Sequence, residues 1–145
     1  MKCALFPMHF WLPAAHGTPG APTAVSAILS GLYIKSGVYL FIRLQAVFSP
    51  VFDMDVFFFW AGVVTALAGI VMAVCQCDIK LILAYHTISQ VGLIIAGLST
   101  SNPVSRFGAM LHIINHALFK SLLFLLPGFS SRLRHPERTI KSAVS

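Results

Sequence analysis

The chain has 145 residues, of which 57% are hydrophobic and only 10% are charged, and its formal net charge is +6. Soluble domains have about a quarter of their residues charged, so the composition excludes an ordinary water-soluble protein and favours one that lies in a bilayer. The positive charge does not indicate nucleic-acid binding, because the basic residues lie at the ends of apolar runs or inside them.

The first twenty residues are apolar but contain Pro7, Pro13 and Pro19. A proline inside a helix removes a backbone donor and clashes with the preceding turn, so this stretch cannot form one regular helix. Irregular backbone at membrane depth is tolerated only where protein or a wet cavity surrounds it. We therefore expect the end of a broken helix followed by a loop.

Four apolar segments follow, and each has about 20 residues, the length that a helix needs to cross a bilayer of about 30 Å. Short connections with turn residues such as Ser49 and Pro50 separate them. The sequence therefore predicts an all-α, polytopic transmembrane bundle over residues 1–128 and a polar, disordered tail over residues 129–145. The four predicted spans are residues 21–42, 56–74, 79–98 and 107–126.

The basic residues outside the spans predict the orientation of the chain. Four spans place six of them on one side: Lys2, Lys80, Arg132, Arg134, Arg138 and Lys141. Only Arg43 and Arg106 fall on the other side. Since cytoplasmic loops carry the excess of Lys and Arg, the first side and both chain ends are expected to be cytoplasmic.

Three titratable residues in the last span form the most informative pattern. His112, His116 and Lys120 are spaced at i, i+4 and i+8, so on a helix they share one face, about 6 Å apart along the axis. Titratable groups at mid-membrane depth are costly unless they face protein or water. A row of groups that can gain and lose a proton near neutral pH is what a proton relay needs. Each residue alone could instead make a helix–helix hydrogen bond or extend towards the interface.

Lys35 is a second intramembrane amine, near the middle of the first predicted span. The four acidic residues of the chain all lie in loops or in the tail. No carboxylate partner at membrane depth is therefore expected for Lys35 or Lys120 within this chain. Either both amines are held neutral, or their partners belong to helices outside this chain.

Metal and haem sites fit the sequence poorly. His112 and His116 have the spacing of a zincin motif, but Ile113 stands where the catalytic glutamate would be. His86 and His116 could in principle bind a haem, although nothing specifies this. The three cysteines, Cys3, Cys75 and Cys77, do not form a CxxC pair or a disulfide framework. We predict no metal site, no cofactor and no catalytic residue.

Several segments in order resemble a known family. Residues 6–16, FPMHFWLPAAH, resemble its FPxHxWLPDAH segment, and five more segments match: APTAVSA at 21–27, KSGVY at 35–39, DIK at 78–80, LAYHTISQVG at 83–92 and NHALFK at 115–120. The family comprises the antiporter-like subunits of respiratory complex I, of membrane-bound and formate-linked hydrogenases, and of multisubunit sodium/proton antiporters. The likeness covers residues 2–128.

This resemblance implies a fold of about fourteen helices with inverted repeats and two discontinuous helices. The chain would begin within the seventh, broken helix and end after the eleventh. Lys2 then matches the channel lysine that pairs with a glutamate on the fifth helix, and Lys35 matches the central connecting lysine of the eighth. His112, His116 and Lys120 match the polar axis residues of the eleventh. The fifth-helix glutamate lies outside this chain, and Ala14 stands where aspartate is usual.

The implied function is that of a segment of a proton-translocating subunit, coupled to redox chemistry in partner subunits of an NADH:quinone oxidoreductase or a membrane-bound hydrogenase. The chain would then be a multi-pass protein of the prokaryotic inner membrane that contacts lipid and other membrane subunits and has no redox centre of its own. The alternatives are a segment of a multisubunit sodium/proton antiporter and a non-functional gene fragment.

The orientation can be tested with reporter fusions. Fusions after Pro50 and after Ser101 should read as non-cytoplasmic, and a fusion after Arg134 should read as cytoplasmic, because the basic residues concentrate on that side. The reversed pattern would contradict the predicted topology.

Overall fold

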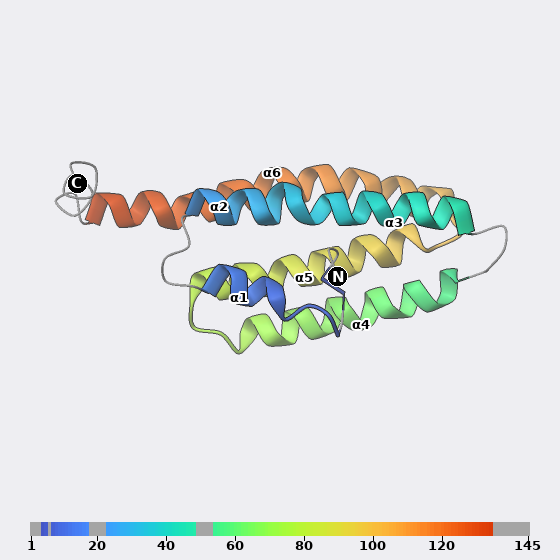
Figure 1. The fold of residues 1–145 in the computed structure, drawn as a ribbon, viewed down its shortest axis with the longest axis horizontal. Coiled ribbons are helices and arrows are strands. Elements are labelled where there is room, and N and C mark those ends of the chain that lie inside the picture. Colours follow the sequence, from blue (N-terminus) through green and yellow to red (C-terminus); the bar gives the residue numbers. More distant parts are fainter. Residues whose placement is uncertain (1–3, 6, 18–22, 49–53, 135–145) are drawn as a thin grey trace.

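A computed structural model describes residues 4–5, 7–17, 23–48 and 54–134 of the chain. The regular elements in these ranges are all helical (Figure 1). They are α1 (Trp11–Gly17), α2 (Thr23–Ile28), the π-helical segment η1 (Leu29–Tyr33), α3 (Ile34–Phe48), α4 (Asp55–Val74), α5 (Ile79–Leu98) and α6 (Pro103–Arg134).

Four helical stretches are long and apolar enough to cross a membrane, and they confirm the predicted all-α bundle with four spans. They are Val25–Phe48, Asp55–Val74, Ile79–Leu98 and Pro103–Leu126. The third agrees with the prediction, 79–98, at both ends. The first ends at Phe48 rather than at residue 42, so Arg43 lies within α3, where its Nε donates a hydrogen bond to the Tyr39 hydroxyl at 3.0 Å.

Helix α6 is longer than the apolar segment that predicted it. It begins at Pro103 and continues through Pro127 to Arg134, whereas the sequence places the last span at residues 107–126. A helix does not have to stop where it leaves the apolar phase, since its backbone hydrogen bonds form equally well outside it. Residues 129–134, predicted as the start of a disordered tail, therefore continue α6, and residues 135–145 lie outside the described part.

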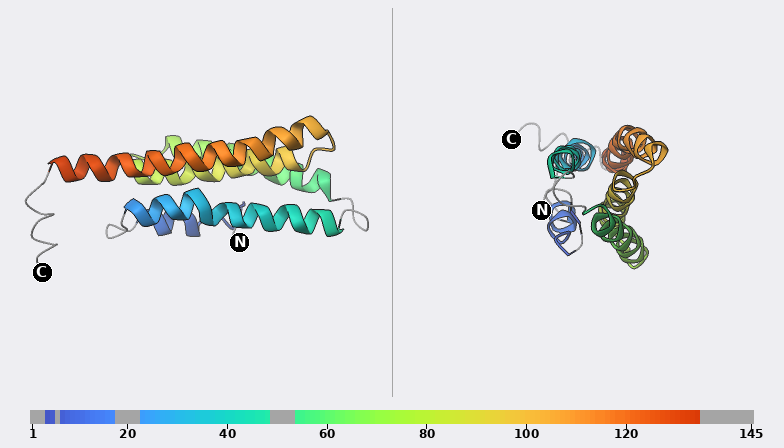
Figure 2. Two further views of the ribbon diagram at one scale, coloured as in Figure 1. Left: turned by 90° about the horizontal axis from the view of Figure 1, so that it is seen from above. Right: turned by 90° about the vertical axis from the view of Figure 1, so that its right-hand side faces the viewer.

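The helices form two layers. In the view of Figure 1, helices α1, α4 and α5 lie in one layer and α2, α3 and α6 in the other, whereas the left view of Figure 2 separates α1, α2 and α3 from α4, α5 and α6. Helix α5 is the central element, because it packs against α1, α3, α4 and α6, while α2 and η1 pack against α6. The connections between spans are short, so α5 and α6 run antiparallel (Figure 1). The start of α5 and the end of α6 lie at the same end of the bundle.

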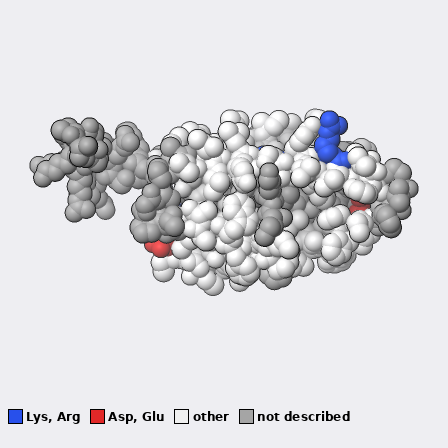
Figure 3. All heavy atoms as spheres, viewed as in Figure 1, with Lys and Arg blue, Asp and Glu red and all other residues white. Residues whose placement is uncertain are grey.

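The buried core follows α5 and the elements around it. Its fully buried apolar side chains come mainly from α5, with contributions from α1 and α3: Leu12, Ile34, Val38, Ile88, Val91, Ile94 and Ile95. Many large apolar side chains of α4 and α6 are instead exposed, such as Phe57, Leu67 and Leu118. The face in Figure 3 is almost free of charge between the helix ends. Such a surface suits lipid or neighbouring helices, and the chain is a multi-pass membrane protein.

The proline-rich start, where the sequence predicts the end of a broken helix followed by a loop, contains a short helix, and residues 18–22 lie outside the described part. Residues 7–10 form a turn, and α1 has only seven residues. Pro13 lies in the first turn of α1, where its missing N–H has no intrahelical partner to lose. This short helix packs against α5.

The first span is interrupted by η1, which the sequence analysis did not predict. At its end the N–H of Ile34 donates to the carbonyl of Leu29, five residues earlier. Short π-helical segments inside α-helices often occur at functional sites. The interruption lies directly before Lys35.

Small residues allow α4 and α5 to approach closely. A Cβ atom added to Gly62 would lie 2.7 Å from the Gly92 carbonyl oxygen and 2.7 Å from the Ala96 nitrogen. A Cβ atom at Gly92 would lie 2.6 Å from the Gly62 carbonyl oxygen, and one at Gly69 would lie 2.7 Å from the Ser89 nitrogen. Small residues at such contacts are the usual means by which membrane helices associate.

Gly62→Ala should therefore destabilise the bundle. The new methyl group meets backbone atoms that cannot turn away, so we expect a loss of about 1–3 kcal/mol, the usual cost of overpacking. The measurement is the free energy of unfolding in detergent.

Gly108→Ala is the matched control, because an added Cβ at Gly108 has no neighbour within 4 Å among the described residues. Alanine is the better helix former, so this variant should equal or exceed the parent in stability. Equal stabilities of the two variants would contradict the close α4–α5 contact.

Candidate functional site

The three titratable residues of α6 lie on one face, as their spacing predicts. His116 and Lys120 are fully buried, and His112 is half-buried. The rings of His112 and His116 are stacked, with centroids 6.1 Å apart and planes at 12°. Their burial excludes, for His116 and Lys120, the simple alternative of polar side chains that extend to the surface of the chain.

Two residues of α5 face this row. His112 Nε2 lies 2.6 Å from Gln90 Oε1, and Lys120 Nζ lies 3.3 Å from His86 Nδ1. His86 and Gln90 are themselves four residues apart, so they share one face of α5. Because α5 and α6 are antiparallel, the two contacts form successive rungs between the helices, and we call these four residues the α5–α6 ladder.

His116 lies between the two rungs. Its ring packs edge-on against Phe119, with centroids 5.2 Å apart, and stacks on His112. Neither ring nitrogen has a hydrogen-bond partner among the described residues. A buried polar group without a partner costs about 1–3 kcal/mol, so a histidine at this position does not contribute to stability through its nitrogens. Native proteins leave few buried polar groups without a partner, so His116 calls for an explanation, and a chemical role is one.

The short helix α1 brings another buried histidine to the end of the row. The His16 ring stacks on Phe124 of α6, with centroids 4.9 Å apart and planes at 22°. Lys120 Nζ lies 5.8 Å from the centre of the same Phe124 ring. Both His16 ring nitrogens are buried and have no hydrogen-bond partner in the described ranges. The broken segment therefore places an imidazole across one aromatic ring from Lys120.

Lys35 is half-buried and is bound within its own span. Its Nζ donates a hydrogen bond of 2.6 Å to the carbonyl oxygen of Ser30. The π-helical segment contains Ser30, and at its end the Ile34 N–H donates to Leu29 and Leu32 rather than to Ser30. The same segment packs on α6, where a Cβ at Gly31 would lie 3.5 Å from Ser121 Oγ.

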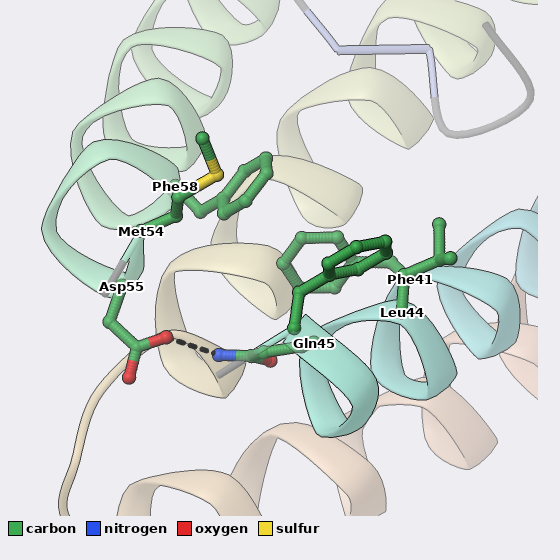
Figure 4. Close-up of a pocket in the computed structure, with 7 residues that line it drawn as sticks. Phe41, Leu44, Gln45, Met54, Asp55 and Phe58 are labelled. Carbon is green, nitrogen blue, oxygen red and sulfur yellow. Dashed lines mark hydrogen bonds between the residues drawn. The ribbon is translucent and has the colours of Figure 1, made fainter. Parts of the chain in front are cut away.

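The carboxylate of Asp55, at the start of α4, contacts Gln45 and Arg106. Asp55 Oδ1 accepts a hydrogen bond from Gln45 Nε2 at 2.7 Å, at the edge of an apolar cavity of about 180 Å³ between α3 and α4 (Figure 4). Arg106 Nη2 lies 3.6 Å from Asp55 Oδ2. These contacts join the ends of α3, α4 and α6. Among the described residues, the hydrogen-bonding partners of the two intramembrane amines are a carbonyl and an imidazole, as the scarcity of acids predicts.

The structure brings together some of the predicted site residues and leaves others apart. His112, His116 and Lys120 lie on one face, Lys35 lies on the neighbouring span, and Lys2 lies outside the described residues. The sequence analysis did not assign His86, Gln90 or His16 to the site. The spacing of His86 and Gln90 in an apolar span, four residues apart as in the row of α6, could have revealed two of them.

Comparison with known proteins gives a match over nearly the whole chain. The model of the family described as "NADH:quinone oxidoreductase/Mrp antiporter, TM" matches residues 1–144. The match extends past residue 128, where the sequence analysis placed the end of the likeness. It therefore includes most of the segment that was predicted as a separate tail.

Similar curated proteins come from different complexes. The chain is 46% identical over 132 residues to a probable K⁺/H⁺ antiporter subunit of Rhizobium meliloti, and the match covers 88% of this chain and 12% of that protein. It is 38% identical to a Na⁺/H⁺ antiporter subunit of Alkalihalophilus pseudofirmus, over 92% of the chain and 27% of the relative. It is 35% identical to a hydrogenase-4 component of Escherichia coli, over 88% of this chain and 21% of that protein. The chain thus spans between about an eighth and about a quarter of these relatives.

Proposed function

We propose that this chain, which belongs to the NADH:quinone oxidoreductase/Mrp antiporter transmembrane family, is a segment of a proton-translocating membrane subunit. The observation that carries this proposal is the row of His112, His116 and Lys120, which lies inside an apolar bundle and contacts polar residues of α5. Ionisable residues inside membrane segments are expensive and typically mark proton or ion pathways.

The row can move protons because each member binds and releases one at nitrogen. His112 and His116 stack at a ring separation of 6.1 Å, a gap that one water can bridge. Lys120 continues the row one helical turn further along α6. In this proposal a proton enters at one end of the row and leaves at the other, while the apolar side chains around it exclude competing paths.

Lys35 supplies the connection to the neighbouring span. Its hydrogen bond to the Ser30 carbonyl holds the amine at the π-helical segment, which packs against α6. Since this partner is a neutral carbonyl rather than a carboxylate, the amine is not fixed in one charge state by an ion pair. Lys2 serves in this proposal as the channel lysine that the family resemblance implies.

We further propose that redox chemistry in partner membrane subunits drives the transport, so that this chain has no redox centre itself. The likeness to the hydrogenase-4 component and to a protein described as NAD(P)H-quinone oxidoreductase chain 4-3, 36% identical, supports this version. The bacterial relatives support a location in the prokaryotic inner membrane.

A second candidate is a segment of a cation/proton antiporter that works without redox partners. The 46% identity to a probable K⁺/H⁺ antiporter subunit favours it. The two versions differ in what drives transport. Proton movement that requires an electron donor supports the first, and proton movement that requires Na⁺ or K⁺ on the opposite side supports the second.

Lys35→Ala, introduced into the subunit that carries this segment, should lower proton translocation by more than half while assembly survives. The reason is that the variant removes a protonatable group at mid-membrane depth but only a small part of the core. Arg43→Ala is the control, because Arg43 is an exposed cation on the same helix. Normal translocation per assembled complex in Lys35→Ala would contradict the proposed role of Lys35.

The row of α6 should behave as one unit. A broken proton path conducts poorly wherever the break occurs, so alanine at His112, His116 or Lys120 should each cost nearly as much as the triple replacement. Residues that only pack should give losses that roughly add and that follow assembly. The measurement is proton translocation per assembled complex for the three single variants and the triple variant.

A further inference from the structure

We infer that His86 of α5 is a further relay residue, which exchanges a proton directly with Lys120 of α6 and so continues the path from the Lys120 end of the row into α5. This inference rests on the proposed proton translocation and adds to it a residue outside the row itself.

The contact that carries the inference is specific and tertiary. Lys120 is fully buried, and its Nζ lies 3.3 Å from His86 Nδ1, on a different helix and 34 residues away in the chain. Transfer between nitrogen atoms needs donor and acceptor within hydrogen-bond reach, which this separation provides. His116, the neighbour of Lys120 within the row, has no hydrogen-bond partner among the described residues. The direct contact of Lys120 is therefore with α5, whereas its step to His116 along α6 needs a bridging water molecule.

The exchange is balanced within the pair. Before the step, the Lys120 ammonium donates to His86 Nδ1, and the neutral imidazole carries its proton on Nε2. One N–H bond of Lys120 breaks, and the Nδ1 lone pair forms the new N–H bond, so that a neutral amine faces an imidazolium. A water molecule then accepts the Nε2 proton on the other side of the ring, and Lys120 takes up the next proton from the row, which completes a net transfer across His86. The step changes no oxidation state, so it needs no oxidant or reductant.

The surroundings of His86 suit such a transfer. The ring meets Phe119 edge-on, with centroids 6.5 Å apart, and Lys120 has Phe124 on another side, so aromatic rings border the contact. His86 itself is only half-buried, whereas Lys120 is fully buried. The imidazole thus places a partly exposed nitrogen-bearing ring next to an enclosed amine.

The contrasting role is that of an anchor, in which His86 only holds Lys120 in place. Asparagine separates the two roles, because its Oδ1 can accept a hydrogen bond near the position of Nδ1 but cannot carry a proton through. The test uses the assembled complex with His86→Asn, Lys120→Met and the double variant. Ser89→Ala is the control on the same helix, because Ser89 packs next to Gly69 of α4.

We expect His86→Asn to assemble normally and to lose proton translocation several-fold, as Lys120→Met does, with no further loss in the double variant. Ser89→Ala should translocate normally. If His86→Asn translocates protons normally and Lys120→Met does not, the relay role of His86 is wrong but the proposed function stands. Normal translocation in Lys120→Met would contradict the proposed function and the pair together. If His86→Asn and a second variant, His86→Gln, both fail to assemble, His86 is a packing residue and the inference is wrong.

Discussion

The antiparallel contact between α5 and α6 is the interaction on which the rest of the structure depends. Polar side chains at membrane depth are expensive unless protein supplies their partners, and here the partners come from across one helix interface. His86 contacts Lys120, and Gln90 contacts His112. The contact therefore satisfies buried polar groups and at the same time aligns groups that can exchange protons. The side-chain nitrogens that hold α5 and α6 together are thus the atoms that carry protons in the proposed function.

The close packing of α4 on α5 fixes the geometry of this contact. Gly62 and Gly92 let the two backbones meet with no room for a Cβ atom, which sets the position of α5 and its rotation about its axis. The small residues occupy one face of α5, and His86 and Gln90 lie on an adjacent face, where they contact α6. Gly62 does not contact the ladder residues themselves, because it meets α5 at Gly92 and Ala96. A larger residue at Gly62 should nevertheless disturb the ladder, because it would displace α5.

The sequence predicts those features that depend on local pattern. The spans follow from the length and hydropathy of each segment, and the common face of His112, His116 and Lys120 follows from their spacing. The π-helical segment before Lys35 could not be predicted, because it depends on how η1 packs against α6. The partner of Lys120 was missed for a related reason: one sequence does not say which turn of α5 lies opposite which turn of α6. The length of α6 was underestimated because hydropathy reports the end of the apolar phase, not the end of the helix.

The two intramembrane amines are held in different ways, and the difference has a mechanical consequence. Lys35 donates to a carbonyl of its own span, so its contact moves with that helix. Lys120 contacts His86 across the α5–α6 interface, so this contact changes whenever the two helices shift. A small displacement of α5 would separate Lys120 from His86 but would leave the Lys35–Ser30 contact intact. Under the proposed function, α5 is therefore the element whose motion would open and close the proton path, while Lys35 stays in register with its span.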